Sequence, residues 1–185
     1  VEYFTFQNIF TDRTLLENIK LLPHGTIARF SLGNARDPSI SRYWDYRFRE
    51  PDNPCKPEEY REELDRLLQQ ALNRQLVSDV ELGSYLSGGM DSGTLTALAA
   101  RQLPDIKTFT CGFDLSSASG IELGFDERSR AEAMSARFKT EHYEMVLKAG
   151  DMERVLPRLA HHLEEPRVGQ SYPNFYAAQL ASKFV

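Results

Sequence analysis

The chain has 185 residues, of which 41% are hydrophobic and 26% are charged, and its formal net charge at pH 7 is -5. These proportions are typical of a globular domain and exclude disordered and fibrous classes. The acidic balance and the scattered basic residues argue against nucleic-acid binding. No apolar run reaches the roughly 18 residues of a membrane span, and no signal-peptide pattern opens the chain. We therefore expect a cytoplasmic protein without a membrane or nucleic-acid partner.

The chain has two cysteines, Cys55 and Cys111. They are far apart in the sequence and have no Cys or His near them, which gives no support for a disulfide framework or a zinc site. We expect two ordinary thiols, with that of Cys111 in a buried strand.

The first 50 residues predict a short β-rich segment. Residues 25–32 alternate polar and apolar side chains at strand period and are followed by a Gly-Asn turn, and a second strand is expected at residues 43–46. Two or three short strands cannot form a hydrophobic core of their own. We therefore expect the segment to be the end of a larger domain. Three prolines within residues 50–57 indicate a linker.

From Pro57 onward the sequence predicts alternating helices and strands. A helix is expected from Pro57 to Leu76, because apolar residues recur at spacings of three and four. Strands are then expected at residues 80–86, 106–113 and 142–147, and helices at residues 92–102, 126–138, 152–162 and 173–185. This alternation predicts an α/β fold, in which helices cover both faces of a parallel sheet and ligands bind beyond the carboxyl ends of the strands.

The most informative stretch is Tyr-Leu-Ser-Gly-Gly-Met-Asp-Ser-Gly at residues 85–93, which joins the first of these strands to a helix. Gly88 and Gly89 let the backbone curl so that several N–H groups converge, and the helix start adds free N–H groups and its positive dipole end. Phosphate or pyrophosphate suits such a loop. No Lys follows the glycines, and the Asp91 carboxylate favours a bridging divalent cation, with magnesium expected. The alternative is a Gly-rich turn in which Asp91 and Ser92 cap the helix.

The Ser-Gly-Gly-x-Asp-Ser string from Ser87 to Ser92 resembles the signature loop of the ATP pyrophosphatases. Three further stretches look like parts of the glutamine-hydrolysing asparagine synthetases. Leu-Pro-His-Gly at residues 22–25, with Tyr-Trp at residues 43–44, is similar to the end of their glutaminase domain, where Leu-Pro-Pro-Gly is usual. Residues 109–113 and the Thr-x-His-x-Glu of residues 140–144 resemble the second and third synthetase strands.

This resemblance covers essentially the whole chain and implies its domain organisation. Residues 1–50 would be the C-terminal remnant of a glutaminase domain, residues 51–57 a linker, and residues 58–185 the N-terminal half of the synthetase domain. The implied fold of that half is the Rossmann-like, parallel-sheet fold of the adenine nucleotide alpha hydrolases, truncated and preceded by the short β-rich segment.

The resemblance also implies a reaction and a set of binding residues. In that family ATP activates the side-chain carboxylate of aspartate as an acyl-adenylate, and ammonia released from glutamine displaces AMP to leave asparagine. The pyrophosphate portion of ATP would be bound by residues of the loop, with Asp91 as a Mg²⁺ ligand. Leu86 and Cys111 fall at strand ends where the family contacts adenine, and a plain core role is the alternative for Cys111. Gly112 would let a ligand, or another backbone, approach closely. The loop residues concerned are Ser87, Gly88, Gly89, Asp91 and Ser92.

Several features of the family are not found within these residues. Glutamine hydrolysis in the family uses an N-terminal cysteine, whereas this chain begins with Val1. A second phosphate loop, Ser-Gly-x-Gly-x-Asp-Glu, would follow Val185 and supply further metal ligands and a general base. Gly93 stands where a hydroxyl residue is frequent, so that one donor would be missing. We therefore expect half of a synthetase site, no catalytic residue within this chain, and no activity of the chain alone.

Other functions remain open on the sequence. A β-lactam synthetase-like or other amidotransferase would use the same loop on a different carboxylate. A non-catalytic ATP-binding module belongs to another class, and Asp91 argues against it because a metal-bridging carboxylate serves a leaving group. A purely structural α/β domain is a third alternative, which Mg²⁺-dependent nucleotide binding that is lost in Asp91→Ala would exclude. His142 is expected as a hydrogen-bonded core histidine rather than an acid–base group. Glu164 and Glu165 either reach the substrate site or form a solvated helix end.

Overall fold

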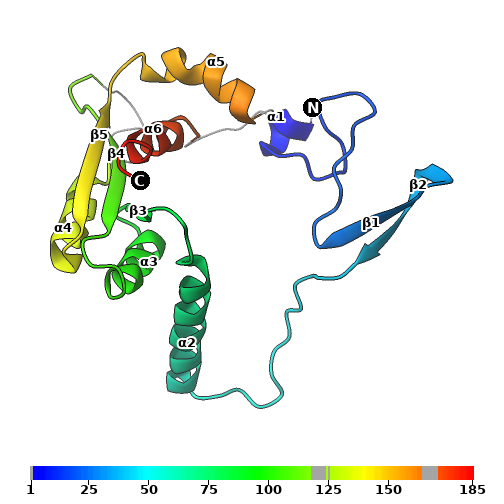
Figure 1. Ribbon diagram of the computed structural model, residues 1–185, viewed down its shortest axis with the longest axis horizontal. Coiled ribbons are helices and arrows are strands. Elements are labelled where there is room, and N and C mark those ends of the chain that lie inside the picture. Colours follow the sequence, from blue (N-terminus) through cyan, green and yellow to red (C-terminus); the bar gives the residue numbers. More distant parts are fainter. Residues whose placement is uncertain (1, 118–123, 125, 164–170) are drawn as a thin grey trace. The chain divides into compact units, whose positions relative to one another are not determined.

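The computed structural model describes residues 2–117, 124, 126–163 and 171–185 (Figure 1). The chain divides into two compact units, Val1–Cys55 and Lys56–Val185. Within the described residues, no helix is long and apolar enough to cross a membrane. The acidic pair Glu164 and Glu165 lies outside the described residues.

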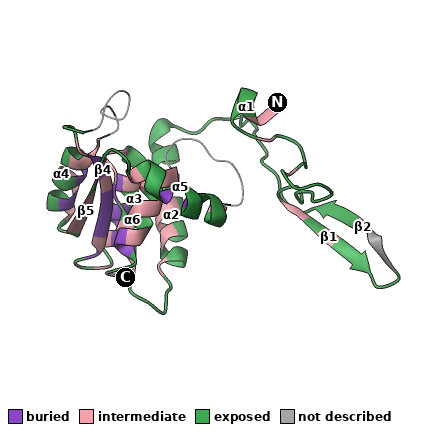
Figure 2. Cartoon of the chain, turned by 90° about the horizontal axis from the view of Figure 1, so that it is seen from above, coloured by how far each residue is buried: buried purple, intermediate pink, exposed green. Residues whose placement is uncertain are grey.

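The first unit contains a short helix, α1 (Glu2–Phe6), and two strands, β1 (Thr26–Ser31) and β2 (Asn34–Arg42). The strands form an antiparallel hairpin that closes through a turn at Leu32 and Gly33. Of the side chains that the structure describes in this unit, none is buried. In Figure 2 the described part of the hairpin is mostly green, with some pink and no purple. The expected β-rich segment without a core of its own is therefore found.

The strand expected at residues 43–46 is a wrong prediction, because β2 ends at Arg42 and the aromatic residues that follow are not in a strand. The aromatic run has strand propensity, but a strand also needs a partner. Pairing with β1 stops at Thr26 opposite Arg42. There the chain turns at Gly25, whose φ is +60°, and the Gly25 carbonyl accepts hydrogen bonds from Tyr43 N at 2.8 Å and Trp44 N at 3.2 Å.

The second unit is an α/β structure around a parallel sheet in the order β3-β4-β5. This confirms the predicted fold class. Its last helix ends at Ala181 rather than running to residue 185. The elements are, in chain order, α2 (Pro57–Gln75), β3 (Gly83–Tyr85), α3 (Met90–Ala100), β4 (Lys107–Phe113), α4 (Arg128–Phe138), β5 (Glu141–Leu147), α5 (Asp151–Leu163) and α6 (Ser171–Ala181).

Helices pack on both faces of this sheet, as expected (Figure 1). On one face lie α3 and α4, and the hydroxyl groups of Ser84 and Thr96 hydrogen-bond between β3 and α3 at 2.8 Å. On the other face α6 packs on β4 and β5, where Phe109, Leu180 and Ala181 form a buried cluster. The buried residues coloured purple in Figure 2 belong to this sheet and its helices.

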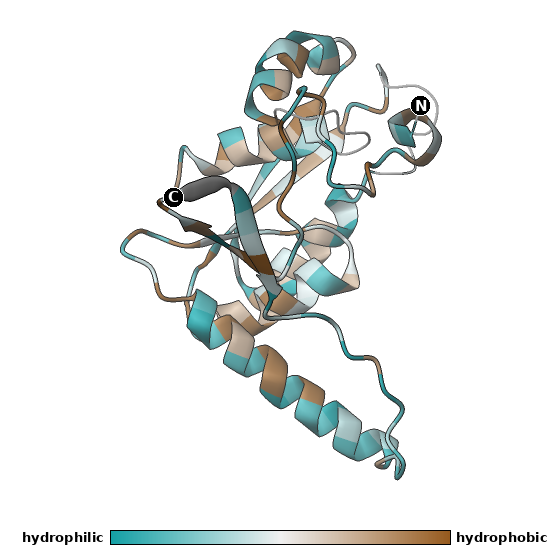
Figure 3. Cartoon of the chain, turned by 90° about the vertical axis from the view of Figure 1, so that its right-hand side faces the viewer, coloured by the Kyte–Doolittle hydropathy of each residue, from teal (hydrophilic) through white to brown (hydrophobic). Residues whose placement is uncertain are grey.

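Two elements differ in detail from their predictions. Helix α2 forms where expected, with Pro57 in its first turn, and Figure 3 shows hydrophobic and hydrophilic residues alternating along it. Its apolar residues Leu64 and Leu67 are nevertheless exposed. Strand β3 is shorter than predicted because Gly83 pairs with Lys107, the first residue of β4, so that Val80 has no strand residue to pair with.

Candidate nucleotide-binding site

The loop that follows β3 is anchored to β4 before the chain turns into α3. Leu86 is 1% exposed, and its N–H donates to the Phe109 carbonyl at 3.0 Å. Its own carbonyl accepts a hydrogen bond from the Thr110 hydroxyl. Both contacts are to β4, which runs parallel to β3. The loop therefore leaves the sheet at the carboxyl end of β3, beside the middle of β4, and the carboxyl edge of a parallel sheet is the usual ligand position in such folds.

Two serine hydroxyl groups hold the loop in a closed turn. The Oγ atoms of Ser87 and Ser92 are 2.8 Å apart, and the Ser87 N–H donates to Ser92 Oγ at 3.1 Å. The Gly89 N–H in turn donates to Ser87 Oγ at 3.1 Å. Because one hydroxyl of the pair must donate and the other accept, both serines are already structural parts of the loop. The pair uses one of its two hydroxyl hydrogens internally, which leaves the other to donate elsewhere.

The amino terminus of α3 leaves backbone donors open at this loop. Gly89 is the N-cap residue and forms no side-chain cap, and the first helical hydrogen bond runs from Gly93 N to Gly89 O at 3.1 Å. The N–H groups of Met90, Asp91 and Ser92 therefore have no acceptor within the helix. Together with the positive end of the helix dipole, they suit an anion.

Asp91 is the charged residue of the loop, and its exposed side chain forms no hydrogen bond or ion pair with the residues that the structure describes. Within the described ranges, no three His, Cys, Asp or Glu side chains come together to hold a metal ion. A magnesium ion at Asp91 would therefore take its other ligands from phosphate oxygens and water, which is how proteins commonly bind Mg²⁺ with one or two carboxylates. The Asp91 carboxylate is an oxygen ligand of the kind that Mg²⁺ prefers, so it suits this ion.

Helix α4 packs against the loop through contacts that the sequence does not reveal. A methyl group on Gly88 would lie 2.6 Å from Cβ and 2.8 Å from Cδ of Arg130, so the stem of Arg130 occupies the space above Gly88. A methyl group on Gly93 would lie 2.9 Å from Sδ of Met134. Gly93, which stands where the family frequently has a hydroxyl residue, is thus a position of close packing between α3 and α4.

Cys111 and Gly112 lie near the carboxyl end of β4. Burial raises the pKa of the Cys111 thiol to about 11, so the thiol stays protonated and is a poor nucleophile at neutral pH. A methyl group on Gly112 would overlap the side chains of Arg128 and Asp126. The close approach expected at Gly112 is therefore made, in this structure, by a side-chain pair.

Asp126 and Arg128 form a two-point ion pair that covers this strand end. Arg128 Nε lies 2.8 Å from Asp126 Oδ1, Nη2 lies 2.8 Å from Oδ2, and Nη2 also donates to the Phe113 carbonyl at 2.9 Å. The hydrogen bonds from Arg128 lower the pKa of Asp126, and those to Asp126 raise the pKa of Arg128. Nε and Nη2 of Arg128 are therefore both engaged within the protein.

His142 lies away from the loop, opposite Thr108 near the start of β4. Its Nδ1 is 2.9 Å from the Thr108 hydroxyl and its Nε2 is 3.3 Å from Glu144 Oε1. Its side chain is 11% exposed. His142 is thus hydrogen-bonded, as expected, but it is partly rather than fully buried.

A parallel sheet whose first strand enters a Ser-Gly-Gly-x-Asp-Ser loop and then a helix defines a Rossmann-like fold of the ATP pyrophosphatase type. Comparison with known proteins narrows this class. The family described as asparagine synthase matches residues 63–185, and the chain belongs to this family.

Three curated relatives have similar sequences. A putative glutamine-hydrolysing asparagine synthetase of Mycobacterium tuberculosis is 31% identical over 185 residues, which is 99% of this chain and 27% of the relative. Asparagine synthetase [glutamine-hydrolyzing] 1 of Bacillus subtilis is 27% identical over 187 residues, or 100% of this chain and 28% of the relative. A second putative synthetase, from Methanocaldococcus jannaschii, is 31% identical over 127 residues, or 67% of this chain and 23% of the relative. The chain thus spans roughly a quarter of the length of these relatives, between 23% and 28%.

Proposed function

We propose that this chain carries the first part of the ATP site of a cytoplasmic, glutamine-hydrolysing asparagine synthetase. In the reaction proposed for the full-length protein, the side-chain carboxylate of aspartate attacks the α-phosphorus of ATP and pyrophosphate leaves. Ammonia from glutamine then attacks the resulting acyl-adenylate, and AMP leaves as the amide of asparagine forms. Membership of the asparagine synthase family supports this proposal.

The observation that carries the proposal is the loop between β3 and α3. Hydrogen bonds of Leu86 to β4 fix its start, the Ser87–Ser92 hydroxyl pair fixes its shape, and the first N–H groups of α3 are left open. We propose that these donors and the two serines bind the pyrophosphate portion of ATP. The glycines Gly88 and Gly89 would let phosphate oxygens approach the backbone closely.

Charge builds on the phosphate oxygens as pyrophosphate departs. Donors already aimed at that position stabilise the transition state without reorganising during the reaction. Asp91 would hold the Mg²⁺ ion, which supplies positive charge to the leaving group. Leu86, Cys111 and Gly112 would lie beside the adenine at the strand ends, a role in which the protonated Cys111 thiol takes no chemical part.

The remainder of the proposal concerns the whole protein. We propose that residues 1–50, which lie in the unit Val1–Cys55, are the end of a glutaminase domain. Residues 58–185, which lie in Lys56–Val185, would be the N-terminal half of the synthetase domain, and the proline-rich residues 51–57 would be the linker between them. Asp91 is the sole carboxylate of the loop, and as a metal ligand it would not also serve as the general base. We therefore expect this chain alone to bind the nucleotide without completing the reaction.

The binding step is tested by titrating the chain with ATP in the presence and absence of Mg²⁺ by isothermal calorimetry. Asp91→Asn should weaken Mg²⁺-dependent binding about tenfold or more, because it removes a charged metal ligand. Asp105→Asn is the matched control, since Asp105 is also exposed but precedes β4 at the opposite end of the strand. Equal binding by both variants would contradict the role of Asp91.

The reaction is tested in the full-length protein by measuring pyrophosphate release with ATP, ammonia and a panel of carboxylates. Release that depends on aspartate supports an asparagine synthetase. Release with another carboxylate favours an amidotransferase of the β-lactam synthetase type, and binding without release favours a nucleotide-binding module. Pyrophosphate release by the present chain alone would overturn the expectation that it holds an incomplete site.

A further inference from the structure

The loop from residue 85 to residue 93 contains no Lys or Arg, and Asp91 gives it a negative charge. A bound pyrophosphate group would add several more negative charges at the same place. Backbone N–H groups and one Mg²⁺ ion offset part of this charge. A cationic side chain from another element would complete the site, and the structure brings one such side chain against the loop.

That side chain is Arg130 of α4. Its Cβ, Cγ and Cδ atoms lie 2.6, 3.3 and 2.8 Å from the position that a methyl group on Gly88 would take. The stem of Arg130 therefore passes directly over the central glycine of the loop. This contact also gives a structural reason for glycine at this position, because any larger residue would displace the arginine.

The guanidinium group of Arg130 is free of hydrogen bonds and ion pairs to the described residues, whereas Nε and Nη2 of Arg128 are engaged within the fold. Arg128 donates to both carboxylate oxygens of Asp126 and to the Phe113 carbonyl. Arg130 is exposed and forms no side-chain hydrogen bond or ion pair with the part of the chain that the structure describes. Arg128 and Arg130 are thus close neighbours on α4, but only the side chain of Arg128 forms hydrogen bonds to the described part of the protein.

The helix dipole does not explain why a cation stands here, although the acidic residues Glu127, at the N-cap, and Glu132 lie within three positions along the chain. Arg130 lies in the first turn of α4, where the positive end of the helix dipole disfavours a positive side chain. That first turn contains no acidic residue. The charge at position 130 therefore costs helix stability, and an anion bound beside Gly88 would offset this cost.

We propose that Arg130 is a phosphate-binding residue of this site and donates hydrogen bonds to the pyrophosphate portion of the nucleotide. This role rests on the proposed function of the loop. A guanidinium group presents several donors in one plane and can engage two phosphate oxygens at once. Arg130 would contact the leaving group from α4, whereas the backbone donors of the site come from the amino terminus of α3.

The test is the binding of inorganic pyrophosphate with Mg²⁺ to the whole chain, measured by isothermal calorimetry. Arg130→Gln retains Cβ, Cγ and Cδ, the atoms that contact Gly88, and removes the charge. It should weaken pyrophosphate binding about 10- to 100-fold, the range expected for charged hydrogen bonds. Arg137→Gln, an exposed position in the last turn of the same helix, is the matched control and should leave binding unchanged.

Further measurements separate a ligand contact from a structural role. Arg130→Lys keeps the charge and should retain most of the affinity, and adenosine, which has no phosphate, should bind equally to all variants. The urea midpoints of the glutamine variants should match. If Arg130→Gln binds pyrophosphate as tightly as Arg137→Gln, the role of Arg130 is overturned while the proposed function stands. If the unaltered chain binds neither pyrophosphate nor ATP, the proposed function is overturned, and this role with it.

Discussion

The two units of this chain use similar residues to different effect. Strands β1 and β4 each have a phenylalanine between two polar residues, yet Phe30 of β1 is 63% exposed whereas Phe109 of β4 is 2% exposed. The difference is that helices pack on the second sheet and, among the described residues, no side chain of the first unit is buried. Strand periodicity thus predicts a strand, but burial depends on what covers it.

The same contrast applies to glycines, to ion pairs and to residues with a left-handed backbone conformation, because both units contain residues of each kind. In Lys56–Val185 these features lie among packed elements, whereas in Val1–Cys55 they lie at the surface. We therefore expect the same substitution to change the stability of the chain when made in the second unit and to leave it nearly unchanged in the first. Four matched pairs test this expectation.

The largest effect is expected for the core phenylalanine. Phe109→Ala should lower the free energy of unfolding of the second unit by about 3–5 kcal/mol, because the ring packs against α6 and a cavity would remain. Phe30→Ala should change it by less than about 0.5 kcal/mol. Urea denaturation followed by circular dichroism at the helix band measures both. Similar costs for the two variants would show that the hairpin contributes to the same cooperative unit.

Glycine substitutions give the second pair. Gly112→Ala should cost about 1–3 kcal/mol, because the new methyl group overlaps Arg128 and Asp126 and must displace their ion pair. Gly33→Ala should be nearly neutral, since no atom lies within 4 Å of the new methyl group. In a double-mutant cycle, Arg128→Ala should reduce the cost of Gly112→Ala. Additive costs would contradict the contact between these positions.

The ion pairs form the third pair. Arg128 lowers the pKa of Asp126, so the pair contributes stability above the unfolded pKa of about 3.9 and loses it as the pH falls through the lower folded pKa. Asp126→Asn should therefore cost about 1–2 kcal/mol at pH 7, and the difference from the unaltered chain should shrink below about pH 4. Asp45→Asn breaks an exposed pair with Arg42 and should cost less than about 1 kcal/mol at any pH. A constant difference between pH 3 and pH 7 for Asp126→Asn would contradict this reasoning.

The sequence predicts the parts of this molecule that depend on neighbours along the chain. The loop at Ser87–Ser92 and the strand and helix on either side of it are predicted from the glycines of the loop and from the spacing of apolar residues in its neighbours, and the structure has all three in this order. The false strand at residues 43–46 and the exposed face of α2 fail for one reason, which is that propensity and periodicity do not say whether a partner exists. The contact of Arg130 with Gly88 joins two helices, and the signal in the sequence is indirect: a first helical turn with arginines and no acidic residue.

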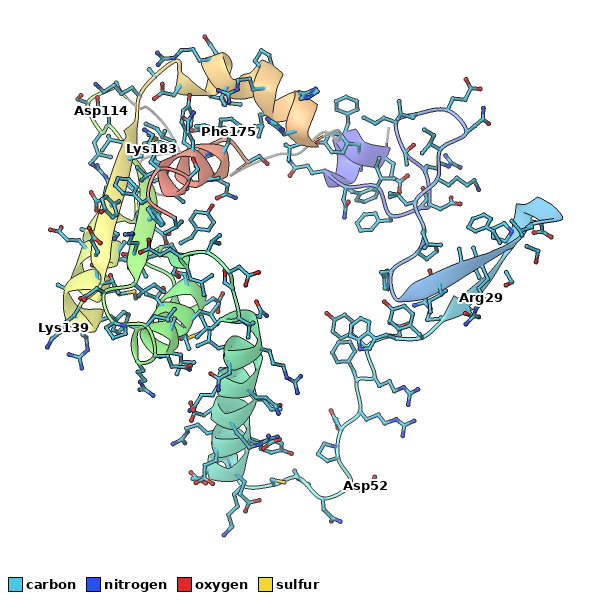
Figure 4. All side chains as sticks on the ribbon, viewed as in Figure 1. Arg29, Asp52, Asp114, Lys139, Phe175 and Lys183 are labelled. Carbon is cyan, nitrogen blue, oxygen red and sulfur yellow. The ribbon has the colours of Figure 1, made fainter. Side chains whose placement is uncertain are left out.

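The smallest effect is expected at the left-handed residues. Lys139 ends α4 with φ +58° and lies at the other end of the sheet from Asp114, as Figure 4 shows. Lys139→Gly should raise the free energy of unfolding by about 0.5–1 kcal/mol, because glycine adopts this conformation without the Cβ clash and so offsets its greater freedom in the unfolded chain. Lys139→Ala keeps Cβ and should bring no gain. Gln7→Gly, at φ +54° in the first unit, should leave the transition unchanged. A gain with alanine would assign the effect to the lysine charge rather than to the backbone, and a gain with Gln7→Gly would mean that the first unit shares the cooperative unfolding of the second.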